Sequence, residues 1–105
     1  MRVPSFVAVL TALAATGCAY DISTPDCAII LTPTDEAICA RPALRRLDRA
    51  MAKQYQVALS ISGDDLPNLR AEQAQWITVR DACGGDEACI AERYRERLNV
   101  LADYD

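Results

Sequence analysis

Cysteine has the widest chemical repertoire of any residue type in this 105-residue chain, because a thiol can form a disulfide, bind a metal or act as a nucleophile. The chain has five cysteines and no histidine. Zinc sites use closely spaced cysteine pairs, and Cys27 to Cys39 and Cys83 to Cys89 are too widely spaced for that pattern. The spacing therefore favours disulfides. Of the three pairings open to these four cysteines, we favour Cys27–Cys39 and Cys83–Cys89, because each is local in sequence and bridges a break between segments.

A second group of residues with chemical potential surrounds the only tryptophan. Gln73, Trp76 and Arg80 recur at steps of three and four, so a helix would place them on one face. Arg80, which precedes Asp81, could anchor a partner or form a buried ion pair with another helix, and Asp48 is one candidate carboxylate. The ion pair is favoured, because an arginine on an apolar helix face needs a partner within the fold. We therefore interpret Gln73, Trp76, Arg80 and Asp81 as a scaffold motif.

Catalysis has little support in the sequence. The lack of histidine removes the usual Ser–His and Cys–His nucleophile pairs. There is no Gly-rich phosphate loop, and no acid stands in the apolar setting that marks a tuned general acid. We expect a protein that is not an enzyme and needs no cofactor or metal.

Charge sets limits on the class of partner. The formal net charge is −4, and it becomes −5 without Arg2, with ten basic against fifteen acidic residues. This balance argues against nucleic acid and against anionic lipid as primary targets, and it suits a basic protein. The candidate partner-binding surface consists of Asp64, Asp65, Asp86, Glu87, Glu92 and Glu96, although a merely solvated helix face is the alternative.

Helical periodicity predicts the elements that must position these residues. The expected fold is all-α, a small bundle of about four helices of which the first is short. After a short helix that begins near Thr32, we expect helices over Pro42–Ser60, Asp65–Cys83 and Asp86–Ala102. Asp64 or Asp65 should cap the third helix and Asp86 the fourth. The predicted core consists of Leu47, Met51, Tyr55, Leu69, Trp76, Ile90, Tyr94 and Leu98.

The N-terminal segment has the layout of a bacterial export signal. Arg2 is followed by an uncharged stretch to Tyr20, whose apolar core is shorter than the roughly 20 residues of a membrane span. Small residues before Cys18 resemble a lipobox, and lipidation of Cys18 would leave four cysteines to pair. Cleavage near Ala19 by ordinary signal peptidase is the alternative. We therefore predict a lipoprotein signal peptide over residues 1–17, a tether over 18–25 and one domain over 26–105.

The order of these residues resembles the N-terminal domain of LprI-type lysozyme inhibitors. The resemblance covers about Asp26 to Leu101 and depends on the paired cysteines together with the Gln73, Trp76, Arg80, Asp81 and Cys83 run. The remaining matching positions are Glu36-Ala37-Ile38, Leu44, Leu47-Asp48, Tyr55, Tyr94, Arg97 and Leu98. The sequence departs from the pattern at Arg41, where an acidic residue is common, which puts in doubt how the helix that follows is capped.

The resemblance implies a small, helical, disulfide-stapled exported domain that inhibits lysozyme. We expect an envelope protein that meets a basic protein such as lysozyme, faces the periplasm and contacts membrane only through its lipid anchor. Ala19 after Cys18 gives no inner-membrane retention signal, which favours an outer membrane where one exists. The alternative is an envelope lipoprotein of structural or interaction type with a different protein partner.

Overall fold

The protein is an all-α bundle in the computed structural model, which describes residues 24–104. Its helices are α2 (Pro33–Ala40), α3 (Pro42–Ile61), α4 (Leu66–Asp81) and α5 (Glu87–Ala102), with a short 3₁₀ turn η1 (Gly63–Asp65) between α3 and α4. The predicted fold of about four helices with a short first one is confirmed. The predicted signal peptide (1–17), Cys18 and the tether up to residue 23 lie outside the described residues.

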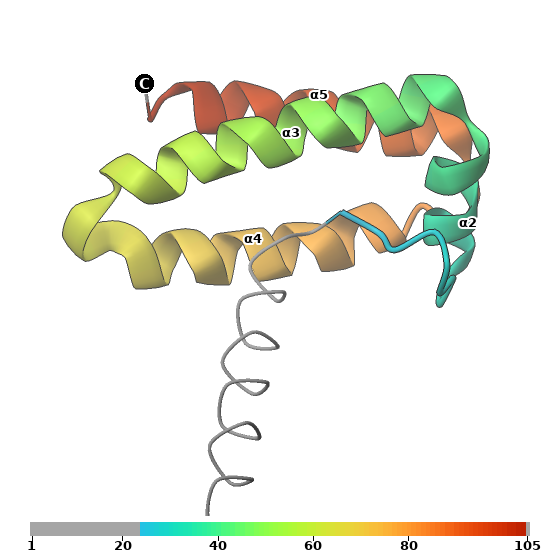
Figure 1. Cartoon of the computed structure of the whole chain (residues 1–105), viewed down its shortest axis with the longest axis horizontal. Helices are drawn as coiled ribbons and strands as arrows, with labels where there is room; N and C mark the ends of the chain where they lie inside the picture. The colour runs from blue at the N-terminus through green and yellow to red at the C-terminus, as the bar shows by residue number, and fades with distance from the viewer. Residues whose placement is uncertain (1–23, 105) are drawn as a thin grey trace, which may run out of the picture.

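The three long helices run side by side, and α2 closes one end of the bundle. Figure 1 shows α3 and α5 together on one side and α4 on the other, with α2 at the end where α3 begins. Helix α3 packs mainly on α5, and α5 also contacts α4, while α2 contacts both α3 and α4. Within the part of the chain that the structure covers, no helix is both long enough and apolar enough to cross a bilayer.

Local sequence explains where the helices begin and end. The Thr32 side chain accepts a hydrogen bond from the Asp35 N–H and caps α2, near where that helix was expected to begin. Asp86 accepts one from the Cys89 N–H, so the predicted cap of α5 is present. The chain turns after α4 at Gly84, whose φ of 60° suits glycine.

The start of α4 differs from the prediction of an aspartate cap. Asp64 and Asp65 lie in the 3₁₀ turn, and Asp65 occupies the N-cap position without a side-chain bond to the backbone. Its Oδ1 instead accepts a hydrogen bond from Asn68 Nδ2 at 3.0 Å. The 3₁₀ turn satisfies local backbone groups, because the Asp65 and Leu66 N–H groups donate to the carbonyls of Ser62 and Gly63.

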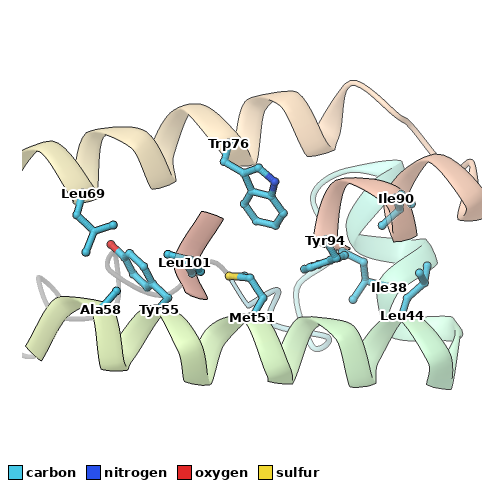
Figure 2. Packing of buried hydrophobic residues seen from close by; sticks show 10 residues of the cluster. All are labelled: Ile38, Leu44, Met51, Tyr55, Ala58, Leu69, Trp76, Ile90, Tyr94 and Leu101. Carbon is cyan, nitrogen blue, oxygen red and sulfur yellow. The ribbon is translucent and has the colours of Figure 1, made fainter. Parts of the chain in front are cut away.

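The core lies between the three long helices and is sealed at one end by α2. Figure 2 shows Trp76 extending from α4 toward Met51 and Tyr94. The buried apolar residues are Ile38, Leu44, Met51, Tyr55, Ala58, Leu69, Trp76, Ile90, Tyr94 and Leu101. Six of the eight predicted core residues are among them, whereas Leu47 and Leu98 are only partly buried at the edge of the cluster. Ile38, Leu44, Ala58 and Leu101 complete the observed core without having been on the predicted list. Ile38 was missed because α2 is too short to show a helical period.

Two disulfides staple the bundle, with the predicted pairing. Cys27 pairs with Cys39, which fastens the segment before α2 to the end of that helix, and the Cα atoms are 5.7 Å apart. Cys83 pairs with Cys89 across the turn between α4 and α5, with a Cα separation of 5.6 Å. Both separations fall within the usual disulfide range. Both disulfides therefore lie at the end of the bundle that α2 closes, because the turn between α4 and α5 is at that same end (Figure 1).

Candidate functional site

The scaffold motif lies on the inner face of α4. Gln73, Trp76 and Arg80 are buried with 3%, 9% and 3% of their surface exposed, and Asp81 is half-buried. The steps of three and four along the helix bring the first three onto the face that meets α3 and α5. Partners within the bundle therefore determine what this motif does.

Trp76 connects α4 to α5 through its polar and apolar groups. Its indole N–H donates to the Arg93 carbonyl at 3.1 Å. Its ring meets the Tyr94 ring edge to face, with centroids 5.2 Å apart. The Arg80 guanidinium carbon lies 5.6 Å from the indole centroid, within cation–π range. The tryptophan is thus enclosed by neighbours in the fold and offers little surface to a partner.

Arg80 is the centre of a buried polar network. It donates from Nη2 and Nε to Asp81 Oδ1 at 2.9 and 3.1 Å, and its Nη2 lies 3.5 Å from Asp35 Oδ1 on α2. Its Nη1 donates to the Tyr94 hydroxyl at 3.2 Å, and that hydroxyl donates to Asp48 Oδ1 at 2.7 Å. The predicted carboxylate, Asp48, therefore belongs to the same network as Arg80 through Tyr94. The network joins α2, α3, α4 and α5.

Burial and charge shift the pKa values of Asp48 and Arg80 in opposite directions, whereas burial and the Asp48 charge both raise the pKa of Tyr94. Burial raises the pKa of Asp48, although the Tyr94 hydrogen bond and the Arg80 charge act against that rise. Burial also raises the pKa of Tyr94, so its hydroxyl stays protonated and can donate to Asp48. For Arg80, burial opposes the charge, yet the Tyr94 oxygen and the Asp81 carboxylate raise its pKa. The network therefore holds one buried cation with its carboxylates, an arrangement suited to fixing helix positions.

Gln73 makes a second cross-link further along α4. Its Oε1 accepts a hydrogen bond from Arg97 Nε on α5 at 2.8 Å, and its Nε2 lies 3.3 Å from the Met51 sulfur on α3. The contacts place the amide between the two helices that face α4. Arg97 is 5% exposed, and burial lowers its pKa.

The six candidate acidic residues are all exposed, but the fold separates them. Asp64 and Asp65 lie in the turn between α3 and α4, whereas Asp86 and Glu87 lie at the start of α5, at the opposite end of α4. A helix of sixteen residues is about 24 Å long, so these pairs cannot form one patch. Figure 1 shows the two turns at opposite ends of the bundle.

Three of the acids on α5 have arginine neighbours. Glu87 Oε1 lies 3.6 Å from Arg41 Nε, and the Glu92–Arg95 and Glu96–Arg93 pairs are 3.8 and 2.9 Å apart. The charge on this helix is therefore locally balanced. Asp64 and Asp65 project at the other end, and the Tyr104 hydroxyl approaches Asp65 Oδ2 at 3.5 Å.

Two exposed features were not singled out as sites from the sequence. The apolar run Ile29-Ile30-Leu31 is 59%, 48% and 80% exposed. Arg45, Arg46 and Arg49 are exposed on the first half of α3. The sequence did offer a signal for the apolar run, because three consecutive aliphatic residues shortly after Cys27 fit no helical stripe. Among the described residues, no group of histidine, cysteine or carboxylate side chains is arranged to hold a metal ion.

Comparison with known proteins gives a consistent family relationship. The family model described as "Lysozyme inhibitor LprI" matches residues 27–101, which spans both disulfides and the buried network. Proteins named "Lipoprotein LprI" from Mycobacterium bovis and from Mycobacterium tuberculosis are 34% identical to this chain over 83 residues. The aligned region is 76% of this chain and only 41% of each relative, so the chain spans well under half of their length. No solved structure matches. The chain therefore belongs to the LprI lysozyme inhibitor family.

Proposed function

We propose that this protein is an exported binding protein of the cell envelope that blocks lysozyme, or a related wall-cleaving enzyme, by covering its cleft. The observation that carries the proposal is the family match over residues 27–101, which includes every helix of the domain apart from the last residue of α5. The domain's polar network is internal, which supports a binding protein with a rigid scaffold over an enzyme.

The contact surface proposed here is the acidic turn, defined as Asp64 and Asp65. Both carboxylates are exposed in a 3₁₀ turn that projects from the end of the bundle. Glu87, Glu92 and Glu96 lie beside arginines, and Asp86 accepts a hydrogen bond as the N-cap of α5, so the acidic turn is the pair of neighbouring candidate acids that these interactions leave available. Lysozyme is basic, and opposite charge speeds encounter and favours this partner.

A cell-wall lysis assay tests whether the protein inhibits lysozyme. Oxidised protein, with Cys18 replaced to avoid lipid, is titrated against lysozyme at low and moderate salt. We expect stoichiometric inhibition that weakens with salt, because exposed charges are screened over a Debye length of about 8–10 Å. A folded, fully oxidised protein that leaves lysis unchanged would contradict the function and favour an envelope lipoprotein with another partner.

Paired variants of equal charge change locate the surface. Asp64→Asn with Asp65→Asn should weaken inhibition, whereas Glu92→Gln with Glu96→Gln should leave it close to the unmodified protein. All four residues are exposed, so neither pair should alter the helical circular dichroism signal. Equal weakening by both pairs would show that net charge alone, and not the acidic turn, governs the encounter.

The proposed anchor is a lipid on Cys18. The relatives are named lipoproteins, which supports it, and one lipid-modified terminus can hold a small domain at a membrane without a span. Mass spectrometry of protein extracted from membranes should find an acylated N-terminus at Cys18. An unmodified chain that begins after Ala19 would contradict the anchor. The periplasmic face of an outer membrane is the proposed location.

A further inference from the structure

The end of the bundle that carries α2 presents a rigid apolar loop to the surroundings. Ile29, Ile30 and Leu31 are consecutive and all exposed, Leu31 at 80%. Contiguous exposed aliphatic side chains on a small protein mark an interaction site. This apolar loop, Ile29–Leu31, lies outside every helix and contributes nothing to the buried core.

Several contacts hold the apolar loop in place from both sides. At its start, Asp26 Oδ1 accepts a hydrogen bond from the Ala28 N–H at 3.0 Å, and the Asp26 carbonyl accepts one from the Ile29 N–H at 2.8 Å. Cys27 is joined to Cys39 at the end of α2, and Thr32 after the loop caps the start of that helix. A loop fixed in this way loses little conformational entropy when it binds.

An arginine cluster lies beside the base of the loop. We define it as Arg45, Arg46 and Arg49, which are all exposed on α3. Cys27 lines a surface hollow with Arg45 and Arg49, and its disulfide partner Cys39 lines a second hollow with all three arginines. A cationic cluster and an aliphatic loop are thus joined at one disulfide, in a chain whose net charge is −4.

The chain enters the domain at the same place. Thr24, the first described residue, lines the hollow that contains Arg45 and Arg49. Thr24 stands six positions after Cys18, and an extended chain of that length reaches at most about 20 Å. A lipid on Cys18 would hold this end of the domain near the bilayer, so that the arginine cluster can approach within a Debye length of about 8 Å, where attraction to anionic headgroups acts.

We propose that the apolar loop and the arginine cluster form a membrane-facing surface that docks this end of the bundle on anionic phospholipid. The aliphatic side chains would enter the interfacial region while the guanidinium groups bind lipid phosphates. The six residues supply aliphatic and cationic groups, the combination that interfacial segments use on anionic lipid. The overall negative charge argued against anionic lipid, but the distribution of charge at this end favours it.

The docking should be reversible. Two exposed acids, Asp26 and Glu36, flank the apolar loop and offset part of the attraction from the arginine cluster. The surface would therefore orient an anchored domain and would not replace the anchor. This inference extends the proposed attachment at Cys18 and is independent of lysozyme binding.

Vesicle flotation tests the surface without the lipid anchor. The chain from residue 18 with Cys18→Ser retains the whole core and both disulfides, all of which lie within residues 24–104. It is mixed with vesicles of pure phosphatidylcholine or of equimolar phosphatidylcholine and phosphatidylglycerol. We expect flotation with the anionic vesicles only, reduced by added salt. Equal flotation with both vesicles, or with neither, would overturn the proposal.

Matched variants assign the binding to the two features. Arg45→Gln with Arg46→Gln should weaken binding about 25-fold, since each arginine near an anionic surface contributes roughly fivefold. Ile30→Ser with Leu31→Ser should also release the protein. Each pair is compared with a control at other exposed positions, Arg70→Gln with Arg95→Gln for charge and Ile61→Ser with Val100→Ser for apolar surface.

The controls distinguish docking through this surface from nonspecific adsorption and from self-association. Control variants that keep full vesicle binding support the proposal, and controls that lose as much binding as the test variants overturn it by showing nonspecific adsorption. Sedimentation of the same samples tests a second copy as the occupant. A concentration-dependent dimer that the Ile30→Ser, Leu31→Ser variant abolishes would overturn the membrane assignment.

Discussion

Removing one oxygen from Tyr94 should destabilise the protein more than its size suggests. The Tyr94 hydroxyl accepts a hydrogen bond from Arg80 at 3.2 Å and donates one to Asp48 at 2.7 Å. Asp48 and Arg80 are 2% and 3% exposed, so water cannot readily replace either bond. Tyr94→Phe keeps the ring and its edge contact with Trp76 while it deletes both bonds.

The expected loss follows from what remains around the two charges. A buried polar group left without a partner costs about 1–3 kcal/mol, and charged groups lie toward the upper end. Arg80 keeps its bonds to Asp81, so most of the penalty falls on Asp48, whose remaining side-chain hydrogen bond comes from Thr24 near the start of the domain. We expect Tyr94→Phe to lower the free energy of unfolding by about 1–3 kcal/mol.

Urea unfolding followed by circular dichroism at constant disulfide content measures this change. Tyr104→Phe is the matched control, because its hydroxyl lies 3.5 Å from the exposed Asp65 and its loss should cost less than about 0.5 kcal/mol. A Tyr94→Phe loss no larger than that of the control would refute the view that the network holds the helices together.

The loss should also depend on pH. Burial raises the pKa of Asp48 in the folded protein above its ordinary value of 3.8. At a pH between the unfolded and the folded pKa of Asp48, the folded state therefore binds more protons than the unfolded state. Stability from this group therefore falls as the pH rises through that window. Deleting the Tyr94 donor raises the folded pKa further, so the deficit of Tyr94→Phe should be largest at neutral pH and shrink as the pH falls toward 3.8.

Two other substitutions test the scaffold. Trp76→Ala should lower the free energy of unfolding by about 3–5 kcal/mol, because it empties a buried aromatic site, and a thermal melt should show it; unchanged stability with lost lysozyme inhibition would instead make Trp76 a contact residue. Replacing Cys83 and Cys89 together by serine should cost about 2 kcal/mol through the short loop that the disulfide closes, measured by urea unfolding. A loss near zero for the disulfide variant would mean that the Gly84 turn is already restricted in the unfolded chain.

The sequence was most informative where the helical period is long. The stripes of α3, α4 and α5 predicted Met51, Leu69 and Ile90 in the core, and the structure buries all three completely. The cysteine spacings were also sufficient to predict the disulfide pairing, and the residues around Thr32 and Asp86 were sufficient to predict where α2 and α5 begin, because each feature depends on neighbours along the chain. Periodicity failed for Ile38 in α2, whose eight residues are too few to establish a stripe.

The polar network could be foreseen only in outline. An arginine on an apolar helix face predicts some carboxylate partner, and Asp48 was a reasonable candidate. The sequence could not show that Tyr94 stands between them, nor that Asp35 on α2 approaches the same guanidinium, because these contacts join residues 14 to 46 positions apart. Only the packing of four helices brings them together.

The separation of charge along the bundle gives a reason why one small domain could serve two surfaces at once. Helix α3 has 20 residues and is therefore about 30 Å long, with the arginine cluster near its start and the acidic turn after its end. More than half of that length separates Arg49 from the end of the helix, which exceeds the Debye length of about 8 Å at physiological salt, so the two groups scarcely influence each other through solvent. Docking of the arginine end on lipid would direct the acidic turn away from the bilayer, toward the space where a basic enzyme would arrive. Charge variants at one end should accordingly leave binding at the other end unchanged. Coupling between vesicle binding and lysozyme inhibition would instead show that the two partners compete for a common face.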